Sequence, residues 1–254
     1  GQFFMVRDPS QTDPLLGRPF ALYDVVMGAD GTPAAIEFVY HVIGKFTSQM
    51  SHWSGGERVE VWGPLGNGFP SIDEAAADTG LGGASPNLIC VGGGIGYTPF
   101  LAMAREAVGQ RTYGNRRALL SCRSVKLLYG SRSASYLPDL SDFGDIPHFT
   151  TEIATDDGTR GHRGFVTDLL TESIQKTEYP LVYCCGPEPM MRAVARICES
   201  QCVACWVSLE SPMACGFGVC FSCVVKVKTD DADGWDYRRT CIEGPVFAAS
   251  TLEW

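Results

Sequence analysis

The stretch Cys215–Cys223, C-G-F-G-V-C-F-S-C, decides how the C-terminal part of this chain folds, together with Cys241, which follows after seventeen intervening residues. A C-x4-C-x2-C run with a distant fourth cysteine is the spacing that holds a 2Fe-2S cluster, because two irons need four thiolates that converge from two sides. Gly216 and Gly218 suit such a loop, since backbone wrapped around a cluster needs unusual dihedral angles. We therefore expect a protein that moves single electrons, with these metal ligands: Cys215, Cys220, Cys223 and Cys241.

A zinc site is the alternative for these cysteines. Cys202 and Cys205 form a second C-x2-C pair, and with Cys220 and Cys223 they give C-x2-C-x14-C-x2-C, just short of the usual zinc-ribbon spacing. That arrangement leaves Cys215 and Cys241 without a role. Four other cysteines are interpreted as buried small hydrophobic side chains: Cys90, Cys122, Cys184 and Cys198.

Composition limits the possible function classes. The chain has 254 residues and a formal net charge of −9, and this acidic balance argues against nucleic acid as a partner. No run approaches eighteen apolar residues, so we expect no membrane span. The opening G-Q-F-F-M-V-R lacks the apolar core of a secretory signal. We therefore expect a cytoplasmic protein whose eleven cysteines form no disulfides.

Residues 1–70 have the pattern of β-structure. Short strand-like runs are separated by Gly, Pro and Asp, which predicts a small antiparallel barrel. The expected strands are Gly1–Arg7, Pro19–Val26, Ala35–Ile43 and Arg58–Trp62, and the expected helix is Thr47–Trp53. Because the chain begins inside a strand-like run, we expect the first strand of the barrel to be missing.

The pattern of residues 71–254 predicts a linker, an α/β domain and a cluster domain. Residues 71–86 are polar and Gly-rich, as linkers are. Strands then alternate with helices over residues 87–208, which indicates a parallel sheet with crossovers. The expected strands are Asn87–Val91, Lys126–Tyr129, Phe149–Ala154, Leu181–Cys184 and Val203–Ser208, and the helices are Pro99–Val108, Gly164–Gln175 and Pro187–Gln201. In the cluster domain, residues 209–254, a hairpin returns Cys241 to its loop through Val224–Lys228 and Tyr237–Thr240.

A glycine loop after the first of these parallel strands predicts a nucleotide site. The run V-G-G-G-I-G-Y-T-P leads into a helix, with Thr98 as the expected N-cap and Pro99 as the first helical residue. Bare backbone there lets a pyrophosphate reach the amides at the helix N-terminus, at Gly92, Gly93, Gly94 and Gly96. The run is not G-x-G-x-x-G, and a plain tight turn is the alternative.

Two further loops bear on the same site. Cys185 ends a strand, and Gly186 and Pro187 turn the chain into a helix, so Cys185 would face the ligand crevice of a parallel sheet. A purely packing role for Cys185 is the alternative. The strand that ends at Tyr129 is followed by G-S-R-S. An acid in this run would favour NAD, whereas Arg132 could tolerate the 2′-phosphate of NADP.

Two segments of the β part are candidate phosphate contacts. Arg18 offers a guanidinium group, and the residues after it, P-F-A-L, offer an aromatic ring. The run G-K-F-T from Gly44 to Thr47 opens a short helix whose amides and hydroxyl can bind another phosphate. A solvated arginine or a plain turn is the alternative for each.

Taken together and in this order, these segments resemble the ferredoxin-reductase superfamily, and within it the iron-sulfur electron transfer subunits of NAD-dependent (class B) dihydroorotate dehydrogenase. The resemblance covers essentially the whole chain, and it implies an FAD-binding barrel, a nicotinamide-binding α/β domain and a C-terminal 2Fe-2S domain. It is carried by the motifs G-Q-F-F-M-V-R, R-P-F-A-L, G-P-L-G-N-G-F, G-G-G-I-G-Y-T-P, T-D-D-G-T-R-G-H-R-G-F-V-T-D, C-G-P-E-P-M-M, M-A-C-G-F-G-V-C-F-S-C and R-T-C-I-E-G-P-V-F.

The resemblance also implies roles for single residues. Arg18 would hold the FAD pyrophosphate, with the isoalloxazine lined by Pro19, Phe20, Ala21 and Leu22. Other FAD phosphate contacts would be Gly44, Lys45 and Thr47. NAD would lie over Gly92–Thr98, with its nicotinamide beside Cys185, Gly186 and Pro187. Two positions depart from the family: Ala21 stands where Ser is frequent, and Phe46 replaces a Gly beside the phosphate.

The resemblance implies a function in pyrimidine biosynthesis. A catalytic subunit with its own flavin would oxidise dihydroorotate within a heterotetramer, and electrons would pass through the cluster and FAD to NAD+. A flavin must stand between a two-electron hydride carrier and a one-electron cluster. The alternatives are a subunit of an NAD(P)H:ferredoxin or sulfur-reducing flavoprotein complex, and a ferredoxin-like electron carrier without flavin.

Overall fold

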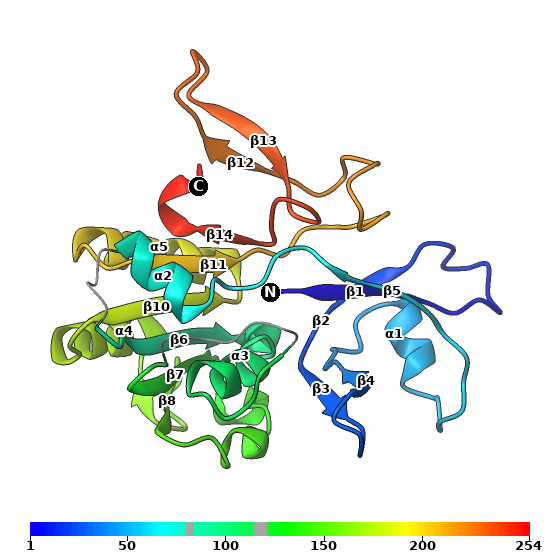
Figure 1. Cartoon of the computed structure of the whole chain (residues 1–254), viewed down its shortest axis with the longest axis horizontal. Helices are drawn as coiled ribbons and strands as arrows, with labels where there is room; N and C mark the ends of the chain where they lie inside the picture. Colours follow the sequence, from blue (N-terminus) through cyan, green and yellow to red (C-terminus); the bar gives the residue numbers. More distant parts are fainter. Residues whose placement is uncertain (80–83, 114–120) are drawn as a thin grey trace. The chain divides into compact units, whose positions relative to one another are not determined.

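The computed structural model describes residues 1–79, 84–113 and 121–254 (Figure 1). The chain forms two compact units. We call the first the cysteine unit, because it contains the four candidate cluster ligands; it comprises Gly1–Gly68, Leu209–Val246 and Glu253. The second, the sheet unit, comprises Phe69–Ser208, Phe247–Leu252 and Trp254. The N-terminal β part and the cluster region therefore share one unit.

Antiparallel strands build the N-terminal part of the cysteine unit, as predicted. Within the described residues they form two separate sheets, of three and two strands. The first has the order β2–β1–β5, from β1 (Phe3–Arg7), β2 (Arg18–Ala21) and β5 (Glu60–Leu65). The second pairs β3 (Asp24–Met27) with β4 (Pro33–Glu37). Residues 38–43, which were expected to continue a strand, lie outside regular structure.

An aromatic cluster explains the short helix of this part, α1 (Lys45–Met50). Phe46 and Met50 are four residues apart and so lie on one helix face, and both are buried. They pack with Phe20, whose ring stacks on Phe38 with centroids 4.8 Å apart. Burial of these rings away from water stabilises the helix, since isolated helices of this length are not stable.

The expected hairpin after the cysteine loop is confirmed. Strands β12 (Val224–Lys228) and β13 (Trp235–Arg239) pair antiparallel, with Val224 opposite Arg239. The hairpin therefore brings Thr240 back to the start of β12, where its backbone N–H donates to the carbonyl oxygen of Cys223 at 2.8 Å.

The sheet unit contains a seven-stranded sheet in the order β14–β11–β10–β6–β7–β8–β9. Every pairing from β11 to β9 is parallel, as the alternating pattern predicts. The strands are β6 (Asn87–Gly93), β7 (Ser124–Ser131), β8 (Phe149–Thr155), β9 (His162–Arg163), β10 (Pro180–Cys185), β11 (Cys205–Ser208) and β14 (Val246–Ala248). The strand order reverses between β6 and β10, and ligands of such sheets bind at that point, outside the carboxyl ends of the strands.

Helices connect these strands. They are α3 (Phe100–Ala107), α4 (Val166–Lys176) and α5 (Glu188–Ser200), with the short 3-10 turns η1 (Gly94–Tyr97), η2 (Ala134–Tyr136), η3 (Ser141–Phe143) and η4 (Ala249–Thr251). Helices α4 and α5 pack against each other and against the sheet (Figure 1). Across the described ranges no helix has the length and apolar character needed to cross a membrane.

A helix lies within the stretch that was interpreted as a linker. It is α2 (Ile72–Thr79), and residues 80–83 of the same stretch lie outside the described residues. A capping box begins it, because the backbone N–H of Ser71 donates to a carboxylate oxygen of Glu74 at 2.8 Å and the N–H of Glu74 donates to the Ser71 hydroxyl at 3.3 Å. Ala75 and Ala76 are buried, so one face of α2 packs against the rest of the unit.

Candidate functional site

The glycine loop leaves β6 at the carboxyl edge of the sheet. Gly94 has a φ of +57°, and its carbonyl oxygen accepts a hydrogen bond from the Tyr129 hydroxyl at 2.8 Å. Thr98 ends the turn η1 and Pro99 is the N-cap of α3, so the prediction that Thr98 caps this helix is wrong. The chain makes the 3-10 turn η1 before it enters α3, so the helix begins at Phe100, one residue later than predicted.

The glycine loop and the loop after β10 touch through their backbones. A Cβ atom on Gly96 would lie 2.1 Å from the carbonyl oxygen of Cys185, so only glycine fits there. A Cβ atom on Gly186, which has a φ of +155°, would lie 3.0 Å from the backbone nitrogen of Gly93. The two segments that the sequence marked separately are thus brought together, and we call them the cradle.

Cys185 stands at the centre of this edge. It pairs in register with Gly92 of β6 on one side and with Ser208 of β11 on the other. Cys185 is half-buried, whereas its neighbour Cys184 is fully buried, and that burial raises the Cys184 pKa. Cys185 is therefore placed at the point where the strand order reverses, as expected for a group that faces a ligand.

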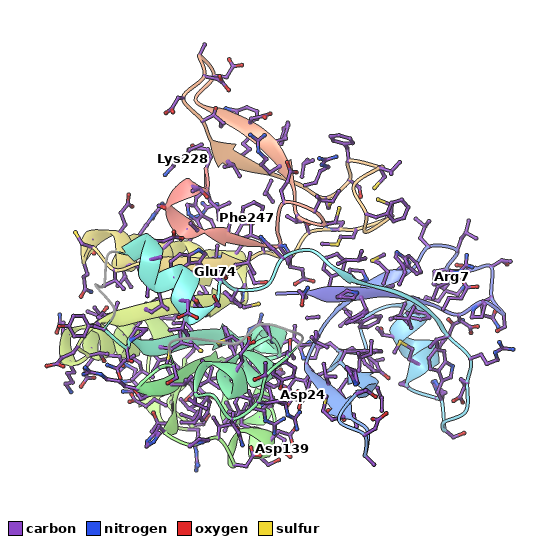
Figure 2. All side chains as sticks on the ribbon, viewed as in Figure 1. Arg7, Asp24, Glu74, Asp139, Lys228 and Phe247 are labelled. Carbon is purple, nitrogen blue, oxygen red and sulfur yellow. The ribbon has the colours of Figure 1, made fainter. Side chains whose placement is uncertain are left out.

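The four candidate cluster cysteines lie in the cysteine unit, where Cys220 interacts with Cys215 and Cys241 interacts with Cys223. Figure 2 draws the side chains of the described residues, with sulfur in yellow. The buried thiols of Cys223 and Cys241 interact with each other. The pKa of Cys241 is raised to about 12, first by burial and then by its hydrogen bond with the Cys223 thiol. Cys220 is exposed, and its pKa is lowered to about 6, first by hydrogen bonds from Ser222 and then by bonds from Cys215.

The loop that carries these thiols has the backbone that the glycines predicted. Gly216 and Gly218 have φ values of +80° and +86°. A Cβ atom would come within 2.6 Å of the Met5 side chain at Gly216 and within 1.9 Å of Ile242 at Gly218. Any other residue would therefore be strained and displaced at both positions.

Three side chains hold the carbonyl groups of this loop. The Trp62 indole N–H donates to Cys215 at 3.2 Å, the Arg239 guanidinium to Gly218 at 3.1 Å, and the Thr240 hydroxyl to Cys223 at 3.0 Å. Sequence reasoning missed Trp62, and it missed Tyr129 in the sheet unit. The only sequence signal for either was an aromatic residue within an expected strand.

The paired thiols fit a two-iron cluster better than a zinc ion. Each iron of a 2Fe-2S cluster takes two thiolates, whereas structural zinc takes four ligands on one centre. Cys205 is buried and its thiol interacts with Cys198, so it is held within the sheet unit by a partner other than the cluster cysteines.

The candidate flavin segments are held by local contacts. Arg18 donates from its guanidinium group to the carbonyl oxygens of Leu16 at 2.8 Å and Gly17 at 3.2 Å. Lys45 forms an ion pair with Asp13. After Arg18, the ring of Phe20 is buried in the aromatic cluster, while the half-buried residues there are Pro19, Ala21 and Leu22.

The start of α1 leaves its backbone open. The Thr47 hydroxyl accepts hydrogen bonds from the N–H groups of Ile43 at 3.1 Å and Gly44 at 3.0 Å. A Cβ atom on Gly44 would meet no atom within 4 Å. Phe46, which stands where the resembling family has glycine, is buried in the aromatic cluster and so does not cover this backbone.

Comparison with known proteins identifies the family. The model of the iron-sulfur cluster binding domain of dihydroorotate dehydrogenase B matches residues 210–253, and an oxidoreductase NAD-binding domain matches residues 90–196. The electron transfer subunit of dihydroorotate dehydrogenase B (NAD(+)) from Geobacillus sp. (strain WCH70) is 35% identical over 99% of this chain and 86% of its own length. This chain belongs to that family. The subunit from Clostridium perfringens (strain 13 / Type A) is 34% identical over 100% of this chain and 86% of its own length.

Solved structures agree with this assignment. The structure described as NADH-dependent reduced ferredoxin-NADP oxidoreductase has a TM-score of 0.75 and 25% identity, and the match covers 100% of this chain and 79% of the other. The ferredoxin reductase of carbazole 1,9a-dioxygenase, at a TM-score of 0.57 and 22% identity over 80% of this chain and 56% of its own, shows the same fold. The ferredoxin-reductase assignment made from the sequence is confirmed.

Proposed function

We propose that this chain is the electron transfer subunit of an NAD-dependent dihydroorotate dehydrogenase, and that it carries electrons from a dihydroorotate-oxidising partner subunit to NAD+. The observation that carries the proposal is the pairing of four thiols in a chain that matches relatives of that name over 99% of its length. The likeness to ferredoxin-reductase structures supports FAD as the third group.

The cysteine loop would hold the cluster. Cys215 and Cys220 would bind one iron, and Cys223 and Cys241 the other, because these are the pairs whose thiols already interact. Met5 and Phe3 pack around the buried pair and would limit the access of water to it. The exposed Cys220 marks the side from which a partner protein can approach.

The cradle of the sheet unit would bind NAD. The bare backbone from Gly92 to Gly96 would take the pyrophosphate, with Thr98 buried beneath the turn. On the β10 side the nicotinamide would lie beside Cys185, Gly186 and Pro187. The half-buried Cys185 would orient the ring and exclude water from it.

The N-terminal strands would form the FAD-binding barrel. Arg18 would exchange its two carbonyl partners for the FAD pyrophosphate, a stronger charge-assisted contact. The open backbone at Gly44, with Lys45 and Thr47, would hold phosphate. Since the Phe20 ring is buried, the flavin ring would meet mainly the backbone and the side chains of Pro19, Ala21 and Leu22. Bound FAD supplies the link between hydride transfer and single-electron transfer.

The catalytic partner subunit would dock on the cysteine loop. Together the two kinds of subunit would form a heterotetramer in the cytoplasm. Phe217, Val219 and Phe221 are 54%, 71% and 62% exposed, although they are apolar. They alternate along the loop, Val219 and Phe221 flank Cys220, and the Arg239 guanidinium lies over the Phe221 ring at 4.8 Å. Exposed apolar surface of this kind indicates a protein-binding site.

The proposal is tested by a coupled assay. The isolated chain, purified without oxygen, should reduce artificial dyes with NADH but should not oxidise dihydroorotate. Addition of the flavin-containing catalytic subunit should restore the transfer from dihydroorotate to NAD+. Oxidation of dihydroorotate by the isolated chain would overturn the proposal, and so would a lack of coupling with a catalytic subunit that is itself active.

A further inference from the structure

Three arginines lie at or after the ends of neighbouring strands at the carboxyl edge of the sheet, and none of them forms an ion pair within the described residues. Arg132 follows β7, Arg160 lies in the loop after β8, and Arg163 ends β9, which pairs with the last residues of β8. All three are exposed. In the same unit, Arg105, Arg123 and Arg192 each pair with a carboxylate.

The topology places this edge where an adenosine would lie. Strands β10 and β7 flank β6 on opposite sides, and β10 carries Cys185. If the nicotinamide lies beside Cys185, as proposed above, the adenosine half extends toward β7. In NAD-selective sites, an acid at the end of the strand that corresponds to β7 binds the ribose 2′-hydroxyl, whereas an arginine there accommodates the 2′-phosphate of NADP. The chain has S-R-S-A-S-Y-L-P from residue 131, and the next acid is Asp139.

The two loops that carry Arg132 and Arg160 are fixed to each other. The N–H of Asp157 donates to the carbonyl oxygen of Arg132 at 3.3 Å, and the N–H of Ala134 donates to the Thr159 hydroxyl at 2.8 Å. Arg160 is fixed to the end of β8, because its backbone exchanges hydrogen bonds with the Thr155 hydroxyl at 2.8 and 3.1 Å. Their guanidinium groups therefore extend from an ordered backbone, so ligand binding orders little beyond the side chains.

The carboxylates near this edge are held by groups other than the arginines. The Asp157 carboxylate accepts hydrogen bonds from the Thr159 hydroxyl at 2.6 Å and the Thr159 N–H at 3.0 Å, and these bonds lower its pKa. Asp168 accepts hydrogen bonds from His162 at 3.2 Å and from the N–H of Phe165 at 3.1 Å. Within the described residues, none of these carboxylates pairs with the guanidinium group of Arg132, Arg160 or Arg163.

We propose that the dinucleotide site accepts a 2′-phosphate on its adenosine, so that this chain uses NADP(H) as well as NAD(H), with Arg132 and Arg160 as the residues that bind this phosphate. The proposal rests on the proposed function, because it assigns the adenosine end of the same site. The hydroxyls of Ser133 and Ser135, 2.7 Å apart, would supply further donors.

The test is the rate of flavin reduction by NADPH and by NADH, measured without oxygen on the purified chain with its cofactors. The wild type should reduce flavin with both, with kcat/KM values within about tenfold of each other. The double variant Arg132→Ser with Arg160→Ser should lower the ratio of the NADPH to the NADH value by roughly tenfold to a hundredfold, the worth of a hydrogen bond to a charged group. Arg196→Ser, an equal loss of charge on exposed α5, is the control and should leave the ratio unchanged.

The outcomes separate this inference from the proposed function. If NADH reduces the flavin and NADPH is more than about a hundredfold poorer, or if the double variant leaves the ratio unchanged, the 2′-phosphate site is wrong and the proposed function stands. If neither dinucleotide reduces the flavin, both are wrong. Inhibition by 2′,5′-ADP that weakens in the double variant, while inhibition by 5′-ADP is kept, would support the assignment independently.

Discussion

Gly96 lies so close to Cys185 that a Cβ atom on it would be 2.1 Å from the Cys185 carbonyl oxygen. This contact joins the glycine loop after β6 to the loop after β10. One loop would bind the pyrophosphate of a dinucleotide and the other its nicotinamide, so their spacing determines where the reactive ring lies relative to the phosphates. The absence of a side chain at Gly96 is therefore a condition for the site.

Replacement of Gly96 by alanine should damage this site. The methyl group would have to displace the backbone of β10, and overpacking of this kind costs roughly 1–3 kcal/mol of stability. Flavin reduction by NADH should also slow, because the loops move apart. Gly109→Ala is the control, since a Cβ atom there meets nothing within 4 Å although φ is +74°. It should lower stability by about 1 kcal/mol and leave flavin reduction intact. Equal kinetics in both variants would refute the role of the contact.

Cys185→Ala tests the residue at the carboxyl end of β10. FAD and iron should stay bound, because the cysteine loop belongs to the other unit. Hydride transfer between NADH and FAD should slow, since the thiol that positions the ring is gone. The measurement is flavin bleaching in a single turnover. An unchanged rate would show that Cys185 serves only for packing.

Much of the fold could be predicted from the sequence, because periodic apolar runs determine which segments are buried. The parallel strands, their helices and the hairpin after Cys223 all followed from such patterns. The buried thiols expected at Cys90, Cys122, Cys184 and Cys198 are confirmed, and burial raises the pKa of Cys122 to about 12.

Other features could not be predicted because they depend on contacts between distant segments. Gly216 packs against Met5, and Cys241 is buried beside Phe3, which brings the cluster region into one unit with the N-terminal strands. No local pattern encodes such a contact. Helix α2 is different, since its signal, the S-x-x-E of Ser71 and Glu74, was present in a stretch whose glycines favoured a linker.

Arg18→Ala should weaken FAD retention. The guanidinium group is proposed to hold the pyrophosphate, and loss of a hydrogen bond to a charged group costs roughly 1.5–3 kcal/mol. Iron should be kept, because Arg18 lies on β2, whereas the buried cysteines pack against Phe3 and Met5 of β1. The ratio of flavin to protein after gel filtration measures the effect. A normal ratio would remove Arg18 from the site.

Phe217→Asp should impair the transfer of electrons from the catalytic subunit. A charge on the exposed apolar loop beside Cys220 would disfavour docking, but the side chain is 54% exposed and the cluster should survive. Val26→Asp, at a 41% exposed apolar position of β3, is the control and should couple normally. Full activity of Phe217→Asp in the coupled assay would place the interface elsewhere.

The most direct test of the account is the iron and sulfide content of cysteine variants purified without oxygen. The wild type should hold about two irons and two sulfides per chain. Cys215→Ser, Cys220→Ser, Cys223→Ser and Cys241→Ser should each lose them and lose dihydroorotate-to-NAD+ transfer with the catalytic subunit. Cys202→Ser, at an exposed position, should keep both. One zinc per chain, lost on replacement of Cys202 or Cys205, would contradict the account.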